Sequence, residues 1–408
     1  MSLAILPLVA MVVGLAAYAV FGGADFGVGF WQLTAGRGER GEAVRDHAQH
    51  AIATVWEANH VWLIFVLTVC WTAYPLAFSS IASTLAIPLF IAALGIVIRG
   101  TSYVLRDLAS NLATHRALGT VFSLSSVLTP FALGTIVGAI AAGRVPVGNA
   151  RGDLVTSWLN TTAIAIGLLS VITTAFLAAV FLTADADRNA TDLIEPFRRR
   201  AMGSGVVAGI AALVGLLIVR AEVPSLWSGL SGGAGLAAVI ISAAGGIATL
   251  LLLGARRYGP ARLAAAIAVA GVVAGWPLAQ RPRFLPGLTI GEAAASRATL
   301  VGLMIAIAAG ALVLFPSLAL LFRLLLRGVF DDSGTDVPQP TGPPAPRAAE
   351  RGRRVVGACT AIMVVTAAVV FVFDPGWITA VGLAGLGLAA VITFIVISID
   401  LIVDTERP

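Results

Sequence analysis

The sequence predicts an all-α fold, a polytopic membrane helix bundle of about 11 transmembrane helices. Two observations support this prediction. The chain has 408 residues, of which 58% are hydrophobic and only 12% are charged, whereas a soluble domain carries about 25% charged residues. Its apolar runs are also long enough for the roughly 20 residues that a helix needs to cross a bilayer. These features exclude a disordered chain, a collagen-like chain and a soluble multidomain enzyme.

The apolar runs divide the chain into three parts. The expected spans lie near residues 3–22, 56–74, 78–98, 118–142, 157–182, 202–219, 234–254, 261–279, 298–326, 355–373 and 377–403. Residues 1–330 form a nine-helix membrane core. Residues 331–350 are polar and rich in Pro, which predicts a flexible cytoplasmic linker. We expect residues 351–408 to form an additional two-helix hairpin and a tail, and a short surface helix within residues 36–55.

The positive charges predict the orientation of the chain. All 26 basic residues are Arg, and basic residues in short loops mark the cytoplasmic side of a membrane protein. With the N-terminus outside, 20 of them fall in inner segments and 6 in outer loops. The sequence therefore predicts an outer N-terminus and a cytoplasmic C-terminus. The net charge of +5 then reflects topology and does not indicate a nucleic-acid partner.

Ionisable residues inside a span are costly in lipid, so each one is a functional candidate. Asp25 stands at the expected end of the first span, in the segment GADFGVG with Gly23, Gly27 and Gly29. These glycines predict a structural turn with close backbone approach. Two interpretations of Asp25 are open: a buried carboxylate on a proton or quinone pathway, or a carboxylate exposed at the membrane interface.

A second polar cluster begins the second expected span, in the segment WEANHVW. Glu57 and His60 are three residues apart and share one helix face, so a buried pair of this kind would pass a proton near neutral pH. Asn59 lies beside them, and Trp56 and Trp62 flank the group as aromatic residues do at a membrane interface. The alternative is an interfacial anchor whose polar groups satisfy one another.

Arg99 ends the third expected span. Its long side chain is expected either to extend to the cytoplasmic headgroups or to be a charge partner for Asp25 or Glu57. The other histidines lie in polar segments and are expected to be solvated: His47, His50 and His115. No Cys or carboxylate spacing completes a metal site around them, so no metal is predicted.

The order of these motifs resembles one known family. The segments GADFGVG (Gly23–Gly29) and WEANHVW (Trp56–Trp62) are followed by an aromatic-Pro pair at Tyr74 and Pro75. This order resembles subunit II of cytochrome bd-type quinol oxidases, whose first helix ends in a GFDLGVG-like turn and whose second begins with W-D-G-N-x-V-W. Segments 128–146 and 276–296 are similar to the family's fourth helix and to the loop before its last helix. The resemblance covers about residues 1–327.

The resemblance implies a function that composition and spacing do not. Such a subunit pairs with a homologous subunit I, which carries the b-type and d-type haems and the quinol site. The complex oxidises quinol and reduces dioxygen to water in the bacterial plasma membrane. Asp25, Glu57 and Asn59 match the family's motif positions, which implies a proton route toward the haems. No cofactor is assigned to this chain itself, a quinone is a further candidate ligand, and small accessory subunits are further candidate partners.

The chain departs from the family pattern at four positions. Gly22 replaces the first acid of the turn, Glu57 replaces an Asp, Ala58 replaces a Gly, and His60 stands where the family has Gln or Glu. These departures leave the proton route open, and two other hypotheses remain beside the resemblance. One is a proton-coupled secondary membrane transporter with Asp25, Glu57 and His60 as its coupling site. The other is a scaffold that has lost the proton route and only stabilises its partner.

Overall fold

A computed structural model of the chain describes residues 3–36, 38–51, 56–107, 112–189 and 191–326. The chain divides into two compact units, Met1–Leu303 and Met304–Pro408. The contacts described below lie within the first unit. The expected linker 331–350 and the expected final hairpin within 351–408 lie outside the described residues, so the predicted boundary at residue 330 stays a prediction.

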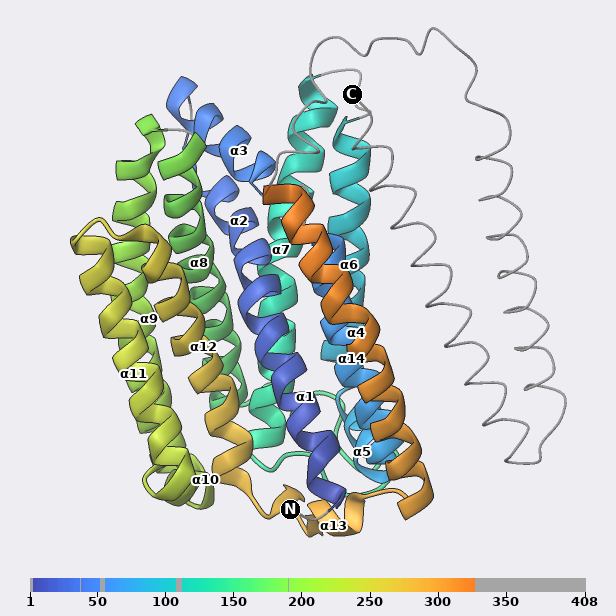
Figure 1. Cartoon of the computed structure of the whole chain (residues 1–408). Coiled ribbons are helices and arrows are strands. Elements are labelled where there is room, and N and C mark those ends of the chain that lie inside the picture. The colour runs from blue at the N-terminus through green and yellow to red at the C-terminus, as the bar shows by residue number, and fades with distance from the viewer. Residues whose placement is uncertain (1–2, 37, 52–55, 108–111, 190, 327–408) are drawn as a thin grey trace, which may run out of the picture. The chain divides into compact units, whose positions relative to one another are not determined.

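Helices dominate the described chain (Figure 1). The first half contains η1 (Leu3–Ile5), α1 (Leu6–Ala17), η2 (Tyr18–Gly22), α2 (Gly23–Leu33), α3 (Glu39–His50), α4 (Trp56–Ala73), α5 (Pro75–Thr84), α6 (Ala86–Asp107) and α7 (Leu112–Ala141). The second half contains α8 (Thr161–Asn189), η3 (Thr191–Leu193), α9 (Ile194–Glu222), α10 (Pro224–Leu230), α11 (Gly233–Gly254), α12 (Tyr258–Gln280), β1 (Arg283–Leu285), β2 (Leu288–Thr289), α13 (Ile290–Ala293) and α14 (Arg297–Leu326).

The membrane class of the chain is confirmed. Among the described residues, 8 helices are long and apolar enough to cross a bilayer, and the apolar segment Asn59–Ala73 of α4 is a shorter candidate. Each expected span before residue 330 therefore has a helix. The total of about 11 spans is not confirmed, because the last two expected spans lie beyond the described part of the chain.

The first helical path is longer than expected. We predicted that it ends near residue 22 and turns at Gly23–Gly29, but α1, η2 and α2 continue to Leu33 (Figure 1). The predicted turn is wrong, since Gly22 and Gly23 both have helical φ angles, −64° and −61°. Small residues in membrane helices instead allow neighbouring helices to approach closely. Asp25 consequently lies inside the helix and not at its end.

The third expected span is two helices. α5 ends at Thr84 and α6 begins at Ala86. Pro88 explains the break, because a proline ring clashes with the carbonyl four residues earlier, here that of Thr84. α6 then continues to Asp107. Arg99 consequently lies within α6, about two turns before its end.

The surface helix expected within residues 36–55 is present as α3, and one face of it is buried. Val44 and Ala48 are 1% and 0% exposed and pack with Leu182 of α8 and with Phe197 of α9. α2 packs against both α7 and α8, and α12 packs against α8 and α11. α3 therefore covers the end of the bundle at which α2, α6 and α8 finish (Figure 1).

Glycines set the spacing between α7 and α8. A Cβ on Gly134 would lie 2.8 Å from Cα of Gly167, and a Cβ on Gly138 would lie 2.5 Å from Cα of Ala163. Both distances are shorter than atoms tolerate, so the two backbones touch only because these positions are glycine. The loop after α12 forms the antiparallel pair β1–β2, whose turn requires the positive φ of Gly287, +74°.

Candidate functional site

A buried ion pair joins Asp25 on α2 to Arg99 on α6. Arg99 Nη2 donates to Asp25 Oδ1 at 2.5 Å and to the backbone oxygen of Asp25 at 3.3 Å, and Arg99 Nε donates to Ser126 Oγ at 2.9 Å. The Asp25 and Arg99 side chains are only 3% and 2% exposed. Asp25 is thus buried and not interfacial, and Arg99 pairs with it instead of extending to the headgroups.

Aromatic rings enclose the guanidinium of Arg99. Its Cζ lies 4.9 Å from the ring centre of Phe26 and 4.8 Å from that of Phe122. A cation over an aromatic face is attracted by the ring quadrupole, and the attraction strengthens where water is excluded. These rings and the ion pair together keep a positive charge inside the bundle, next to a carboxylate.

The glycines around Asp25 position α2 against its neighbours. A Cβ on Gly27 would clash with the backbone oxygen of Thr174 on α8, and a Cβ on Gly29 would lie 2.6 Å from Ser126 Oγ on α7. Contact this close brings Ser126 within reach of Arg99. Gly23, Gly27 and Gly29 therefore act as packing positions within a helix and not as the structural turn that the sequence predicted.

Two residues of the second polar cluster lie next to this ion pair. Asn59 is 4% exposed and donates from Nδ2 to the backbone oxygen of Phe21 at 3.3 Å. The His60 ring centre lies 6.0 Å from that of Phe26 and 6.2 Å from that of Tyr18. α4 therefore contacts the helical path that carries Asp25.

The other members of that cluster are on α4 as expected. Trp62 is half-buried, and the side chains of Trp56 and Glu57 are outside the described set. The predicted partnership of Glu57 with His60 or Arg99 stays a prediction.

Tyr18 packs beside the ion pair, against Phe26 and His60, and the sequence did not reveal it. It begins the π-helical turn η2, a widened turn that is frequent at functional sites. Its ring covers Gly22, where a Cβ would lie 3.1 Å from ring carbons. Tyr18 is 6% exposed, and among the described residues neither its hydroxyl nor Asp25 Oδ2 has a hydrogen-bond partner. The sequence signal that could have found Tyr18 is its spacing: it stands four residues, about one helical turn, before Gly22, which replaces an acid of the family motif.

A cavity of about 140 Å³ borders Asp25 on one side of the ion pair. Its polar lining comes from Asp25, Asn59, Asp185 and Arg262, and its apolar lining includes Phe181. Asp185 also lies 3.3 Å from Nε2 of His47, measured from its Oδ2.

Sequence reasoning missed Asp185 because the fifth span was expected to end at residue 182, whereas α8 continues to Asn189. His47 is only 10% exposed, so the expectation that it is solvated is wrong. The face of α3 that carries it packs against α8 and α9.

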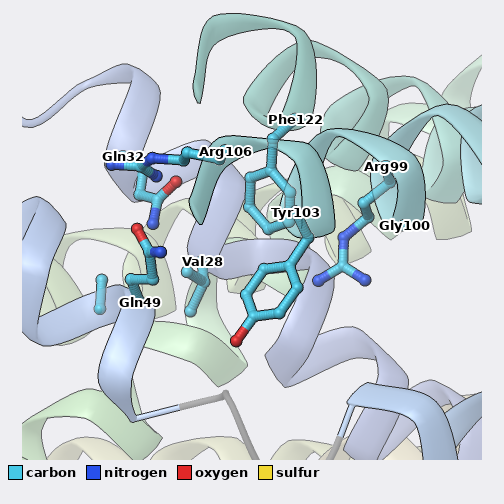
Figure 2. A pocket seen from close by; sticks show the side chains of 9 residues that line it. Val28, Gln32, Gln49, Arg99, Gly100, Tyr103, Arg106 and Phe122 are labelled. Carbon is cyan, nitrogen blue, oxygen red and sulfur yellow. The ribbon is translucent and has the colours of Figure 1, made fainter. Parts of the chain in front are cut away.

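A second, much smaller cavity of about 10 Å³ lies on the Arg99 side. The residues that line it are Val28, Gln32, Ala48, Gln49, Arg99, Gly100, Tyr103, Arg106 and Phe122. In Figure 2 the Arg99 guanidinium lies at one end of this group, and Gln32, Gln49 and Arg106 lie at the other. Arg106 Nε donates to His115 Nε2 at 3.1 Å, so His115, which was expected to be solvated, is an acceptor for a buried arginine.

Two described histidines, His47 and His115, do not fit as axial haem ligands. Nε2 of His47 faces Asp185, and Nε2 of His115 accepts from Arg106. An axial ligand must instead offer a nitrogen to a buried pocket wide enough for the macrocycle. Within the described part of the chain, no group of three or more His, Cys, Asp or Glu side chains is placed to hold a metal ion.

Comparisons with known proteins identify the family. Residues 3–325 match the family described as cytochrome bd terminal oxidase subunit II. The chain belongs to this family. It is 24% identical to a putative cytochrome bd menaquinol oxidase subunit II of Bacillus subtilis over 52% of this chain, and 28% identical to cytochrome bd ubiquinol oxidase subunit 2 of the same organism over 30% of this chain. It spans 61% and 35% of the lengths of those two relatives.

The fold agrees with this membership. A chain of the solved bd oxidase from Geobacillus thermodenitrificans superimposes with a TM-score of 0.67 at 25% identity, covering 80% of this chain and 99% of that chain. The hypothesis of a proton-coupled secondary transporter is unsupported by these matches, and the resemblance stated from the sequence is confirmed.

Proposed function

We propose that the chain is subunit II of a membrane complex that oxidises quinol and reduces dioxygen to water, and that Asp25 carries protons toward the haems of a partner subunit I. Membership of the cytochrome bd subunit II family supports the complex and its haem-bearing partner. The two Bacillus subtilis relatives are named for different quinols, menaquinol and ubiquinol. The quinol substrate, a quinone held by this subunit and small accessory subunits belong to the same proposal.

The observation that carries the proton role is the state of Asp25. Its Oδ1 is held by Arg99, while its Oδ2 is buried without a hydrogen-bond partner among the described residues, and the side chain lines the 140 Å³ cavity. A guanidinium does not give up its proton in proteins. Arg99 therefore fixes the carboxylate, and Asp25 is the member of the pair that accepts and releases a proton, at Oδ2.

Glu57, His60 and Asn59 extend this proposed route along α4. The ring contacts of His60 with Phe26 and the hydrogen bond of Asn59 to Phe21 put α4 beside the Asp25 helix. The b-type and d-type haems would be held by subunit I, where they supply the reduction of dioxygen. In this proposal the chain itself holds and transfers protons, through the carboxylates of Asp25 and Glu57 and the imidazole of His60.

The arginine distribution supports the orientation in which α3 faces the cytoplasm. Arg40 and Arg45 lie on α3, and Arg188 ends α8 at the same end of the bundle (Figure 1). We propose the bacterial plasma membrane as the location, with the N-terminus outside and the C-terminus in the cytoplasm. Protons taken from the cytoplasm would then reach Asp25 from the α3 end.

The test is the substitution Asp25→Asn in the complex purified with its partner subunit. We expect quinol-driven oxygen consumption to fall by about 10²-fold, in line with the loss of a positioned acid–base group, while the haem spectrum is retained. Asp153→Asn is the matched control, because Asp153 is an exposed loop carboxylate and its loss should leave turnover unchanged. Normal turnover of Asp25→Asn would favour the hypothesis that the subunit is only a scaffold.

A further inference from the structure

The larger cavity connects Asp25 to a second carboxylate close to the surface. Asp25 and Asn59 border it from α2 and α4, and Asp185 and Arg262 border it from α8 and α12. A buried water needs roughly 10–15 Å³ of such space and two to four polar partners. A volume of about 140 Å³ with four polar side chains therefore accommodates a short chain of waters between the two carboxylates.

Asp185 borders the cavity and is also partly exposed to solvent. Its side chain is 29% exposed, compared with 3% for Asp25. Its Oδ2 lies 3.3 Å from Nε2 of His47, within ion-pair distance, although this Nε2 forms no hydrogen bond among the described residues. The His47 ring packs 5.5 Å from that of Phe197. A carboxylate that is partly exposed and also borders the cavity is placed to collect protons from solvent.

The charged groups around Asp185 come from three helices. His47 contacts it from α3, Arg262 stands beside it on the cavity wall from α12, and Arg188 follows it on α8. The Arg262 guanidinium lies 5.6 Å from the ring centre of Phe181, which holds it against the wall. These cations offset the negative charge of two carboxylates that border one cavity.

The smaller cavity is a poorer path for protons. Its volume of about 10 Å³ holds about one water. Arg99 and Arg106 both line it, and two fixed positive charges oppose the approach of a hydrated proton. The acid-lined cavity is consequently the better route to Asp25.

We propose that His47 and Asp185 form the proton-uptake site of this subunit, and that water in the 140 Å³ cavity conducts the proton from Asp185 to Asp25. This inference rests on the proposed proton role of Asp25. The partly exposed carboxylate of Asp185 takes a proton from solvent, with His47 beside it, and then releases a proton to a cavity water. That water passes one proton to Asp25 Oδ2. Asp185 is then a carboxylate again and accepts the next proton from solvent.

The experiment compares Asp185→Asn with Asp187→Asn in the purified complex. Asp187 is two residues further along α8 and is exposed, so its substitution changes the same net charge without touching the cavity. Oxygen consumption is measured across pH, together with its solvent deuterium isotope effect. We expect Asp185→Asn to lower turnover on the order of 10-fold at alkaline pH, where protons are scarce, with a larger isotope effect. Asp185→Glu should restore both.

Each outcome separates this inference from the proposed function. An unchanged pH profile in Asp185→Asn, with Asp25→Asn still impaired, overturns the uptake site and leaves the role of Asp25 standing. Normal turnover in both variants overturns both. If Asp185→Asn fails to assemble, as judged from the haem spectrum, His47→Gln decides: a wild-type pH profile in that variant overturns the proposed pair.

Discussion

The two cavities beside the Asp25–Arg99 pair differ in size and in charge. The cavity that Asp25 borders measures about 140 Å³ and has two carboxylates and one arginine in its lining, whereas the one that Arg99 borders measures about 10 Å³ and has two arginines and no carboxylate among the residues that line it. Val28 lines both, so α2 lies between them. The ion pair thus lies between a larger cavity with two carboxylates and a smaller one lined by arginines.

This difference is the basis of the proposed direction of proton movement. Low dielectric strengthens every charge interaction inside the bundle, so the charge of a lining affects which ions enter it. In the proposed route protons enter by the cavity that Asp25 borders, while Arg99 holds the Asp25 carboxylate from the other side. Substitutions that break the Asp25–Arg99 ion pair, that displace α2 or that change the arginine lining of the smaller cavity should therefore lower stability by decreasing amounts.

The largest effect is expected from breaking the ion pair. Arg99→Met leaves the 3% exposed carboxylate of Asp25 without its partner, which should destabilise the fold by about 3–5 kcal/mol. Thermal unfolding of the purified complex measures this loss. The double variant Asp25→Asn with Arg99→Met removes both charges and should recover most of the stability. A single variant as stable as the wild type would contradict the importance of the pair.

The next largest effect is expected from displacing α2, which lies between the two cavities. Gly27→Ala puts a Cβ against the backbone oxygen of Thr174, so α2 must shift away from α8 at a cost of about 1–3 kcal/mol. Gly209→Ala is the control, because nothing lies within 4 Å of a Cβ at that helical position. The control should be neutral or slightly stabilising. Equal unfolding temperatures for both variants would show that α2 and α8 are not in close contact.

A smaller effect is expected from changing the cationic lining. Arg106→Gln removes the hydrogen bond to His115, at 3.1 Å, and should cost about 1 kcal/mol of stability. Turnover should stay near the wild-type rate at every pH, since the proposed uptake route does not pass through this cavity. Oxygen consumption that falls as far as in Asp185→Asn would place the uptake route on the wrong side of the ion pair.

The smallest effect is expected at Tyr18. Its hydroxyl has no hydrogen-bond partner among the described residues, and Tyr18 is not among the residues that line either cavity. Tyr18→Phe should therefore change stability by less than about 1 kcal/mol and leave turnover unchanged. In the control Tyr74→Phe, the hydrogen bond to the backbone oxygen of Ala4 at 2.5 Å is lost, and a loss of about 1 kcal/mol is expected. A strong fall in turnover for Tyr18→Phe would instead add Tyr18 to the proton route.

The sequence alone determined the class of the protein and most of its membrane helices. Low charge and apolar runs are properties of composition, and lipid allows few structures other than helices to satisfy the backbone. The same reasoning selected Asp25, Asn59, His60 and Arg99, because ionisable and polar groups in apolar runs stand out. It ended the first helix too early, since glycine in a sequence signals either a turn or a close helix contact.

Tertiary structure decided which of these residues meet. Asp25 and Arg99 are 74 positions apart in sequence, and their contact depends on how α2, α6 and α7 pack. Asp185 and His47 lie on different helices, in polar segments outside the expected spans, and no local pattern connects them to Asp25. Cavities form where side chains of several helices fail to fill space, so neither their volume nor the sign of their lining can be derived from one helix at a time.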